Sequence, residues 1–307
     1  MNSIGSTFQP TATTTGTGPK LTGAIPTLKL SDGNEIPMLA YGLGTAYGES
    51  GQVVNSAVAA INAGFTHLDG AEVYGNEKDL GAAIRRSGVP RSQLFVTTKV
   101  WTVPTNVKAA FQGSLDRLGL DYVDLYLLNW PQVANTPARL QEVWAEVEEI
   151  RASGKARSIG VSNFLQEHFE IIFKTARTKP VINQIEYHPY LQHGGLIDYH
   201  RQHGIATAAY AALTPVTKAQ QGPVDNIYAA LARKYGVSMS EVALRWVIDQ
   251  GIVAVTTSNS EQRLQGYQRN LPQFKLTPSE IQEISSLGNQ KHYRGFFNDI
   301  YGPDDRR

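Results

Sequence analysis

Residues 94–129, LFVTTKVWTVPTNVKAAFQGSLDRLGLDYVDLYLLN, contain one complete strand–helix–strand unit. Two short apolar runs, at 94–99 and 123–129, flank a segment at 107–119 that has the composition of a helix. Strands with apolar residues on both faces, separated by helices, are typical of a parallel sheet covered by helices. This stretch therefore predicts a βαβ unit in which both strands are buried.

The same alternation of a short apolar run and a helical segment continues along the chain. Eight strands are predicted, at 38–44, 67–69, 94–99, 123–129, 157–162, 181–186, 205–210 and 252–257. Eight such units in about 270 residues match an α/β fold, the (β/α)8 TIM barrel. An open doubly wound sheet fits less well, because YGLGTAYG at 41–48 has the wrong glycine spacing for a dinucleotide-binding turn.

The ends of the chain differ from this repeating pattern. Residues 1–22 are rich in Ser, Thr and Gly, and we expect a disordered tail there, followed by a single barrel domain at 23–307. Apolar and polar residues alternate over 27–39 around Asp32 and Gly33, which predicts a short β-hairpin before the barrel. The last segment of the chain is expected to form a loop over the barrel mouth.

Composition limits the classes of partner. The chain has 28 Lys and Arg against 27 Asp and Glu, a net charge of +1, which offers no basic field for nucleic acid or an anionic membrane. It has no cysteine, which excludes disulfides, thiolate zinc sites, iron–sulfur clusters and a cysteine nucleophile. No apolar stretch approaches the roughly 20 residues of a membrane span. We expect a cytoplasmic monomer with a small-molecule partner and no metal.

Three polar residues are the last residues of consecutive predicted strands. Asp69, Lys99 and Asn129 are each separated by one βα repeat of 30 residues, so a barrel brings them to one rim. The carboxyl-terminal rim is where TIM barrels carry their active sites. A buried ammonium needs a counter-ion, and Asp69 is the obvious partner of Lys99.

This acid–amine pair alone is equally compatible with a structural salt bridge. Tyr74 favours a catalytic role, because it lies five residues beyond Asp69 in a loop long enough to fold back toward Lys99. A neighbouring ammonium stabilises phenolate, so such a tyrosine becomes a general acid that works near neutral pH.

Several motifs in order give these residues a family context. They are GLGTA at 42–46, GFTHLDGAEVYGNE at 64–77, TTKVW at 97–101, LLNWP at 127–131, RSIGVSNF at 157–164 and NQIEYHPYL at 183–191. From about Leu28 to Leu287 the chain resembles the aldo-keto reductases. It is most similar to their yeast and filamentous-fungal ketoreductase branch, and VTTSNSEQRL at 255–264 contributes to that likeness.

The resemblance implies NADPH-dependent reduction of aldehydes, ketones or dicarbonyls. Asp69, Tyr74 and Lys99 would be three members of the catalytic tetrad, with Tyr74 giving a proton to the carbonyl oxygen while the cofactor delivers hydride. Asn129 takes the fourth position, which is normally histidine. An amide orients a carbonyl by donating a hydrogen bond but has no titrating ring proton.

The resemblance also assigns the cofactor site. Its residues would be Thr45, Ala46, Ser162, Asn163, Gln184, Tyr210, Leu213, Thr214, Thr257, Ser258, Asn259 and Arg263. Ser162, Asn163 and Gln184 would bind the nicotinamide carboxamide, and Tyr210 would stack on the ring, which suits their chemistry.

The cofactor segments depart from the family pattern in two places. Ala211 and Ala212 follow Tyr210 where the family has Ser and Pro, which weakens the transfer of pyrophosphate contacts to Leu213 and Thr214. Thr257 replaces a lysine, so Arg263 is left as the cation for the 2′-phosphate, and NADH is less firmly excluded.

Aromatic residues are candidates for the substrate pocket. Tyr47, Trp101 and Trp130 are expected to contact substrate. Tyr293, Phe296 and Phe297 near the end of the chain either wall the same pocket or only pack against the barrel rim.

Three other functions remain open. Asn129 is compatible with reduction of a conjugated C=C bond, since family members that lack the histidine include such enzymes. A lysine at a barrel strand end also suits a Schiff-base aldolase, with Lys99 as the nucleophile. The third alternative is a regulatory subunit that keeps the cofactor pocket without turnover.

Overall fold

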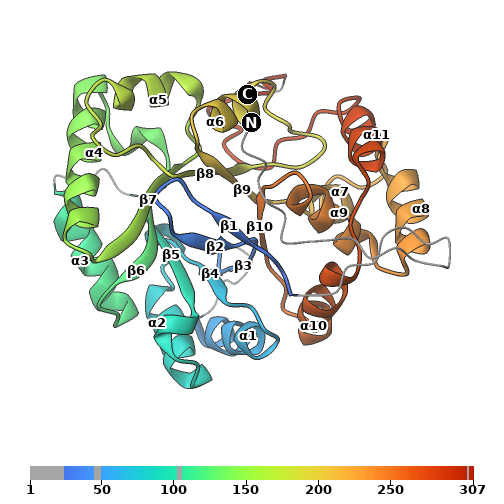
Figure 1. Cartoon of the computed structure of the whole chain (residues 1–307), viewed down its shortest axis with the longest axis horizontal. Coiled ribbons are helices and arrows are strands. Elements are labelled where there is room, and N and C mark those ends of the chain that lie inside the picture. Colours follow the sequence, from blue (N-terminus) through green and yellow to red (C-terminus); the bar gives the residue numbers. More distant parts are fainter. Residues whose placement is uncertain (1–23, 45–49, 102–105, 303) are drawn as a thin grey trace.

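The computed structural model describes residues 24–44, 50–101, 106–302 and 304–307 of the chain. Eight parallel strands close into a barrel in the order β10-β3-β4-β5-β6-β7-β8-β9 (Figure 1). They are β3 (Leu39–Gly42), β4 (His67–Asp69), β5 (Phe95–Val100), β6 (Val123–Leu128), β7 (Ala156–Ser162), β8 (Ile182–Glu186), β9 (Ala206–Tyr210) and β10 (Val253–Thr256). The predicted (β/α)8 TIM barrel is confirmed, with every strand within the predicted runs or a residue or so beyond them.

Helices surround the barrel on its outer side (Figure 1). They are α1 (Ser50–Asn62), α2 (Glu77–Ser87), α3 (Val107–Leu118), α4 (Pro137–Ala152), α5 (Gln166–Phe173), α6 (Leu196–Gln202), α7 (Thr214–Thr217), α8 (Asp225–Tyr235), α9 (Met239–Ile248), α10 (Glu261–Asn270) and α11 (Pro278–Gly288). Short 3-10 turns are η1 (Glu72–Tyr74), η2 (Arg91–Gln93), η3 (Pro131–Val133) and η4 (Leu271–Gln273). Within the described residues, no helix is long and apolar enough to cross a membrane.

Local sequence signals set where these helices begin and end. Thr136 accepts a hydrogen bond from the backbone of Arg139, and Pro137 occupies the first turn of α4, where its missing N–H costs nothing. Gly119 ends α3 in the left-handed conformation at φ 63°, which a residue with a Cβ adopts at a cost. Both helix ends are therefore set by residues that adjoin them in the sequence.

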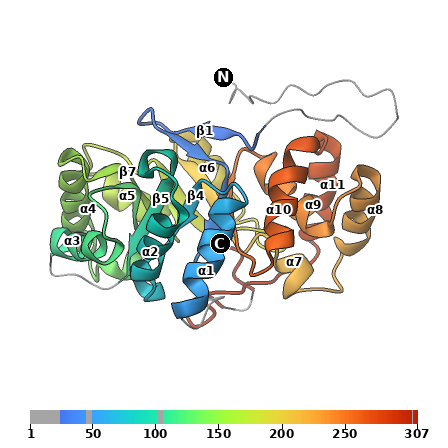
Figure 2. The ribbon, with the colours of Figure 1, turned by 90° about the horizontal axis from the view of Figure 1, so that it is seen from below.

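The predicted hairpin lies at the amino-terminal end of the barrel. It consists of β1 (Thr27–Lys29) paired antiparallel with β2 (Glu35–Pro37). Its loop is wider than a two-residue turn, because Leu30 N donates to Asn34 O at 2.8 Å and Gly33 takes the positive φ of 91°. Figure 2 shows the hairpin and α7 at opposite ends of the molecule.

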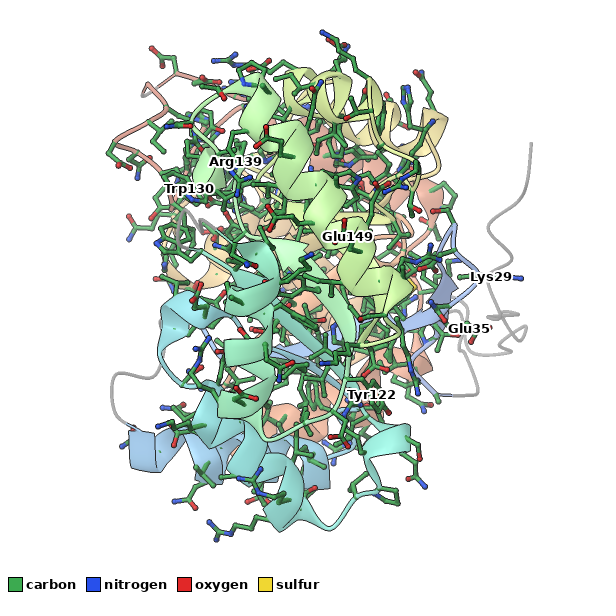
Figure 3. The ribbon with its side chains drawn as sticks, turned by 90° about the vertical axis from the view of Figure 1, so that its left-hand side faces the viewer. Lys29, Glu35, Tyr122, Trp130, Arg139 and Glu149 are labelled. Atoms are coloured by element: carbon green, nitrogen blue, oxygen red, sulfur yellow. The ribbon has the colours of Figure 1, made fainter. Side chains whose placement is uncertain are left out.

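Labelled side chains mark the same two ends. Lys29 and Glu35 of the hairpin lie at one end and Trp130, just after β6, lies at the other (Figure 3). Trp130 follows the carboxyl end of its strand, so the hairpin closes the floor of the barrel and leaves the opposite mouth as the place for a site.

A buried polar contact lies inside the barrel below Lys99. On β5, the Oγ1 atom of Thr97 lies 3.0 Å from Nε2 of His67 on β4, and both side chains are fully buried. Two residues further along β5, Lys99 points inward too, because successive side chains alternate between the faces of a strand. Burial is the main cause that lowers the pKa of His67, so this contact is uncharged below the Lys99 ammonium.

Candidate active site

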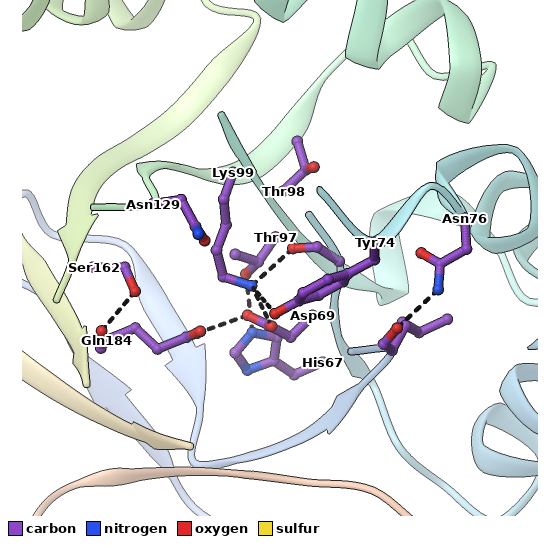
Figure 4. Close-up of polar contacts among 12 residues, drawn as sticks. His67, Asp69, Tyr74, Asn76, Thr97, Thr98, Lys99, Asn129, Ser162 and Gln184 are labelled. Carbon is purple, nitrogen blue, oxygen red and sulfur yellow. Dashed lines mark hydrogen bonds and ion pairs between the residues drawn. The ribbon is translucent and has the colours of Figure 1, made fainter. Parts of the chain in front are cut away.

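The carboxyl ends of β4 and β5 bring a carboxylate, an amine and a phenol together (Figure 4). Lys99 Nζ lies 2.5 Å from Asp69 Oδ1 and donates to Gly70 O at 2.8 Å and to Tyr74 Oη at 3.5 Å. The side chains of Lys99 and Asp69 are 1% and 2% exposed. The contact predicted from the spacing of these residues is present in the structure.

The Lys99 ammonium is held in its charged form. Burial by itself lowers the pKa of Lys99, but the charge of Asp69, the Tyr74 phenolic group and the hydrogen bonds to both outweigh burial and raise the pKa. A Schiff-base lysine needs the opposite, a neutral amine with a lowered pKa. The aldolase alternative is therefore disfavoured by the contacts of Lys99.

Tyr74 reaches Lys99 because its loop is compact. It closes the single turn η1, where Tyr74 N donates to Ala71 O at 3.2 Å, and Gly75 leaves the turn at φ 68°. Asn76 Nδ2 then donates to Leu43 O at 2.8 Å, which ties the loop to the end of β3. The phenol is thus positioned by backbone contacts on both sides.

Two carboxylates, the half-buried Glu72 and the buried Glu77, secure the same loop from the outer side. Glu72 Oε2 accepts from Trp101 N at 3.1 Å, and Glu77 Oε1 accepts from Thr98 Oγ1 at 2.6 Å. Arg117 of α3 binds Glu77 at 2.6 Å and lies 3.8 Å from Glu72. This arrangement links the Tyr74 loop to β5. It also gives a structural role to the charged side chains of Glu72, Glu77 and Arg117, which lie next to the strand that carries Lys99.

Polar side chains on the opposite half of the rim form one connected network. Gln184 Nε2 donates to Asp69 Oδ2 at 2.7 Å, and Ser162 Oγ donates to Gln184 O at 2.7 Å. Asn163, in the left-handed conformation at φ 59°, accepts from Tyr210 Oη at 2.8 Å and donates to Asn129 O at 2.8 Å. The carboxamide-binding residues expected from sequence are therefore side by side.

A pocket of about 600 Å³ opens above this network. Of the expected site residues, those that line it are Asp69, Tyr74, Trp101, Asn129, Ser162, Asn163, Gln184, Tyr210, Leu213, Thr214 and Thr257. Lys99 lies beneath the lining and contacts it through Asp69 and Tyr74. The volume is within the range of small-molecule sites, roughly 300 to 1,000 Å³.

The remaining expected residues are not part of the pocket lining or fall outside the described residues. Arg263 on α10 donates to Ser258 Oγ at 2.9 Å and to Asn259 Oδ1 at 3.2 Å, next to Thr257 on the pocket wall. Thr45, Ala46 and Tyr47 fall in the residues 45–49, which the structure does not describe.

The aromatic residues separate into lining and packing groups. Trp101 and Phe297 line the pocket, whereas Trp130 is not part of the lining. Its ring stacks on Trp101 at 4.8 Å with an interplanar angle of 8° and on Phe297 at 5.8 Å. Phe296 also lines the pocket, but Tyr293 instead lies 6.3 Å from the ring of His188.

Sequence reasoning missed two residues near this pocket. Lys218 lines it, with Nζ 4.9 Å from the ring centroid of Phe296. The spacing of Thr214, Thr217 and Lys218 places all three on one helical face after β9, a signal that was available. Glu186, two residues beyond Gln184, ends β8 at the same rim and was also overlooked.

Comparison with known proteins agrees with this geometry. Residues 40–289 match the Aldo/keto reductase family, and the chain belongs to it. It is 38% identical over 273 residues to an NAD/NADP-dependent indole-3-acetaldehyde reductase of Schizosaccharomyces pombe, with 86% of this chain and 96% of that protein covered. The identity to a glyoxal reductase of Bacillus subtilis is 36%, with 86% and 94% covered.

Solved structures show the same likeness. A Bombyx mori aldo-keto reductase in complex with NADP superposes with a TM-score of 0.82 at 34% sequence identity, covering 91% of this chain and 97% of that one. The fold and the family predicted from the sequence motifs are both confirmed by these comparisons, and reduction of carbonyl compounds is the general activity that they support.

Proposed function

We propose that the chain is an NADPH-dependent carbonyl reductase that converts aldehydes and ketones to alcohols, with Tyr74 as the proton donor. The observation that carries this proposal is the position of the Lys99 ammonium, 2.5 Å from Asp69 and 3.5 Å from Tyr74, directly under the pocket. A phenol in this position faces the pocket with a fixed cation behind it.

The residues around the pocket fit a nicotinamide cofactor. Thr256 Oγ1 is buried on the pocket wall and has no hydrogen-bond partner within the part of the chain that the structure describes. Hydroxyl and amide groups of Ser162 and Gln184 match a primary carboxamide, and the Tyr210 ring offers a flat face for a heterocycle. When bound, NADPH would supply the hydride for which the side chains have no source.

The chain's own residues would then move one proton. The Tyr74 phenol donates its proton to the substrate oxygen, and the Lys99 ammonium stabilises the phenolate that remains. Asp69 keeps Lys99 charged and correctly oriented, while Gln184 holds the second carboxylate oxygen of Asp69 at 2.7 Å.

Asn129 directs the proposal toward activated carbonyls. Its side-chain amide lines the pocket and makes no hydrogen bond to another described side chain or backbone group, so its N–H groups are available to a substrate oxygen. An amide polarises a carbonyl less than an imidazolium does, and electron-poor dicarbonyls need less help. The relative from Bacillus subtilis is named a glyoxal reductase, and glyoxal is a dicarbonyl.

Arg263 supports the preference for NADPH over NADH. Its side chain is exposed, and two of its guanidinium nitrogens bind Ser258 and Asn259, the residues that follow Thr257 of the pocket lining. A guanidinium is a good ligand for a phosphate such as the 2′-phosphate.

We also propose that the chain works as a cytosolic monomer on a small carbonyl substrate.

A substrate panel tests this function. Loss of NADPH absorbance is followed with plain aldehydes and ketones, with dicarbonyls and with a conjugated enone, and the products are identified. We expect alcohols, formed fastest from dicarbonyls. Saturation of the enone C=C bond beside an untouched carbonyl would contradict carbonyl reduction, and tight NADPH binding without turnover of any compound would favour a regulatory subunit.

A further inference from the structure

A buried carboxylate ties the last part of the chain to the barrel rim. Glu186, the final residue of β8, is 2% exposed. Its Oε1 accepts from Gly295 N at 2.7 Å and its Oε2 accepts from Phe296 N at 3.1 Å. The same carboxylate lies 3.0 Å from Nε2 of His188. Two backbone donors more than a hundred residues away in sequence therefore depend on one side chain.

Apart from the two backbone N–H donors and the His188 ring, the other groups near Glu186 do not bind its carboxylate. Burial lowers the pKa of His193 to about 4, so this ring is neutral near pH 7, and its Nε2 lies 2.6 Å from the backbone oxygen of Glu186. Arg294 directs its guanidinium away, onto the Tyr301 ring at 4.1 Å and the backbone oxygen of Asp305. Hydrogen bonds to a charged acceptor are about twice as strong as neutral ones, so this anchor is a strong one.

The anchored segment carries the aromatic wall of the pocket. Phe296 meets the ring of Tyr210 edge-on, at 5.3 Å and 89°, and Phe297 stacks between the pocket and Trp130. Phe297 has a positive φ of 60°, a conformation that a non-glycine residue adopts only at an energetic cost. A strained residue next to a double hydrogen bond indicates that its position is enforced.

Glu186, which binds the last part of the chain, is the sheet neighbour of Tyr210, which is proposed to stack on nicotinamide. Glu186 on β8 is paired with Tyr210 on β9 in the strand register. The spacing between the ring proposed to stack on nicotinamide and the rings that face the substrate is thus set by two neighbouring residues of the barrel rim. Lys218 contacts the Phe296 ring, at 4.9 Å.

We propose that Glu186 is a positioning residue for substrate specificity. By fixing the backbone of Gly295 and Phe296, it sets the depth of the aromatic wall and favours carbonyl substrates bulky enough to touch that wall. The claim about substrate preference rests on the proposed carbonyl reductase activity. The claim that Glu186 fixes the backbone of Gly295 and Phe296 does not depend on that activity.

Glu186→Gln tests both parts, because the amide keeps the shape but turns an N–H₂ group toward one of the two backbone donors. We expect KM for an aromatic ketone to rise about tenfold or more, the effect of losing a charged hydrogen bond, while kcat changes little. KM for a small dicarbonyl is expected to stay within about threefold, since it does not reach the wall. Backbone amides of residues 295–300 should exchange with deuterium faster in the variant.

Two further variants control for general damage. Glu280→Gln alters another buried carboxylate, which binds Lys234 and Tyr235 far from the pocket, and it should change stability without changing the ratio of KM values. Gly295→Pro removes the N–H that binds Glu186 Oε1 and places ring atoms against that oxygen, which an added Cβ alone would approach to 3.0 Å. It keeps Glu186 itself, so it should reproduce the effect of Glu186→Gln even if the latter folds poorly.

The outcomes separate the two claims. If Glu186→Gln leaves both the KM ratio and the exchange of residues 295–300 as in the wild type, or if Glu280→Gln changes the ratio equally, Glu186 is not a positioning residue. If the wild type reduces no carbonyl at all, the proposed function fails, while faster exchange in Glu186→Gln would still support the anchor and unchanged exchange would overturn it.

Discussion

Gln184 Nε2 donates a hydrogen bond to Asp69 Oδ2 at 2.7 Å, across 115 residues of sequence. This bond joins a residue expected to bind the cofactor to the carboxylate that holds the Lys99 ammonium. The residues proposed to bind the cofactor and the group proposed to donate the proton are therefore parts of one network, and we expect a change on one side to affect the other.

Gln184→Leu should weaken both the binding of the cofactor and the hydrogen-bonded support of Asp69. We expect NADPH binding to fall about tenfold and the free energy of unfolding to drop by about 1 to 3 kcal/mol, because Asp69 keeps a buried oxygen without a donor. Fluorescence titration and thermal unfolding measure the two effects. Gln112→Leu, at an exposed position that donates to Asp116, serves as the control. Unchanged NADPH affinity would show that Gln184 does not bind the cofactor.

Arg263→Ala separates NADPH from NADH. Loss of a charged hydrogen bond to the 2′-phosphate should weaken NADPH binding by roughly 1.5 to 3 kcal/mol and NADH binding far less. The matched control is Arg269→Ala, an exposed arginine on the same helix that donates to Asn270. Equal losses for the two cofactors would remove Arg263 from the phosphate site.

Asn129→His tests the departure from the family pattern. Imidazole titrates near pH 6.5, whereas an amide keeps one charge state across the physiological range. The variant should reduce plain ketones better than the wild type and acquire a pH dependence of kcat/KM near 6.5. A wild type that already reduces plain ketones as fast as dicarbonyls would contradict the role assigned to the amide.

We expect His200 to make the stability of the fold depend on pH. Burial, followed by the charges of His193 and His203, lowers its pKa to about 3, and its ring nitrogens contact Asn183 and Thr207. The unfolded chain binds this proton below about pH 6.5 and the folded chain does not, so stability is complete above pH 6.5 and falls as the pH drops toward 3.

The expected size of this effect is about 2 kcal/mol at pH 5. Thermal unfolding between pH 7 and pH 5 should therefore show a smaller loss in His200→Gln than in the wild type. Part of the slope will remain, because His193 has a pKa of about 4. Identical slopes for the two proteins would mean that His200 is not the group that titrates.

The fold was accessible from the sequence because its signals are local. Asp69, Lys99 and Asn129 each end a buried apolar run, and their regular spacing places them on one rim whatever the loops do. The contact of Tyr74 with Lys99 followed from the length of a single short loop. For the same reason the hairpin was predicted, although its loop is wider than the Asp32-Gly33 pair suggested.

The rest of the site depends on contacts between distant segments. Phe296 and Phe297 reach the pocket because Glu186 binds the backbone beside them, and no local pattern near residue 296 shows this. Trp130 was expected to contact substrate; its ring stacks on Trp101 and Phe297, which line the pocket, while Trp130 itself is not part of the lining. Sequence spacing does not show which of these rings lines the pocket.

Kinetics of Tyr74→Phe test the central claim most directly. The variant loses one hydroxyl and keeps the ring, so NADPH affinity by fluorescence titration should stay as in the wild type. The rate of dicarbonyl reduction should fall by roughly 10² to 10⁴, the usual contribution of a general acid. A variant that binds NADPH normally and still reduces the dicarbonyl at a rate close to that of the wild type would show that Tyr74 is not the proton donor.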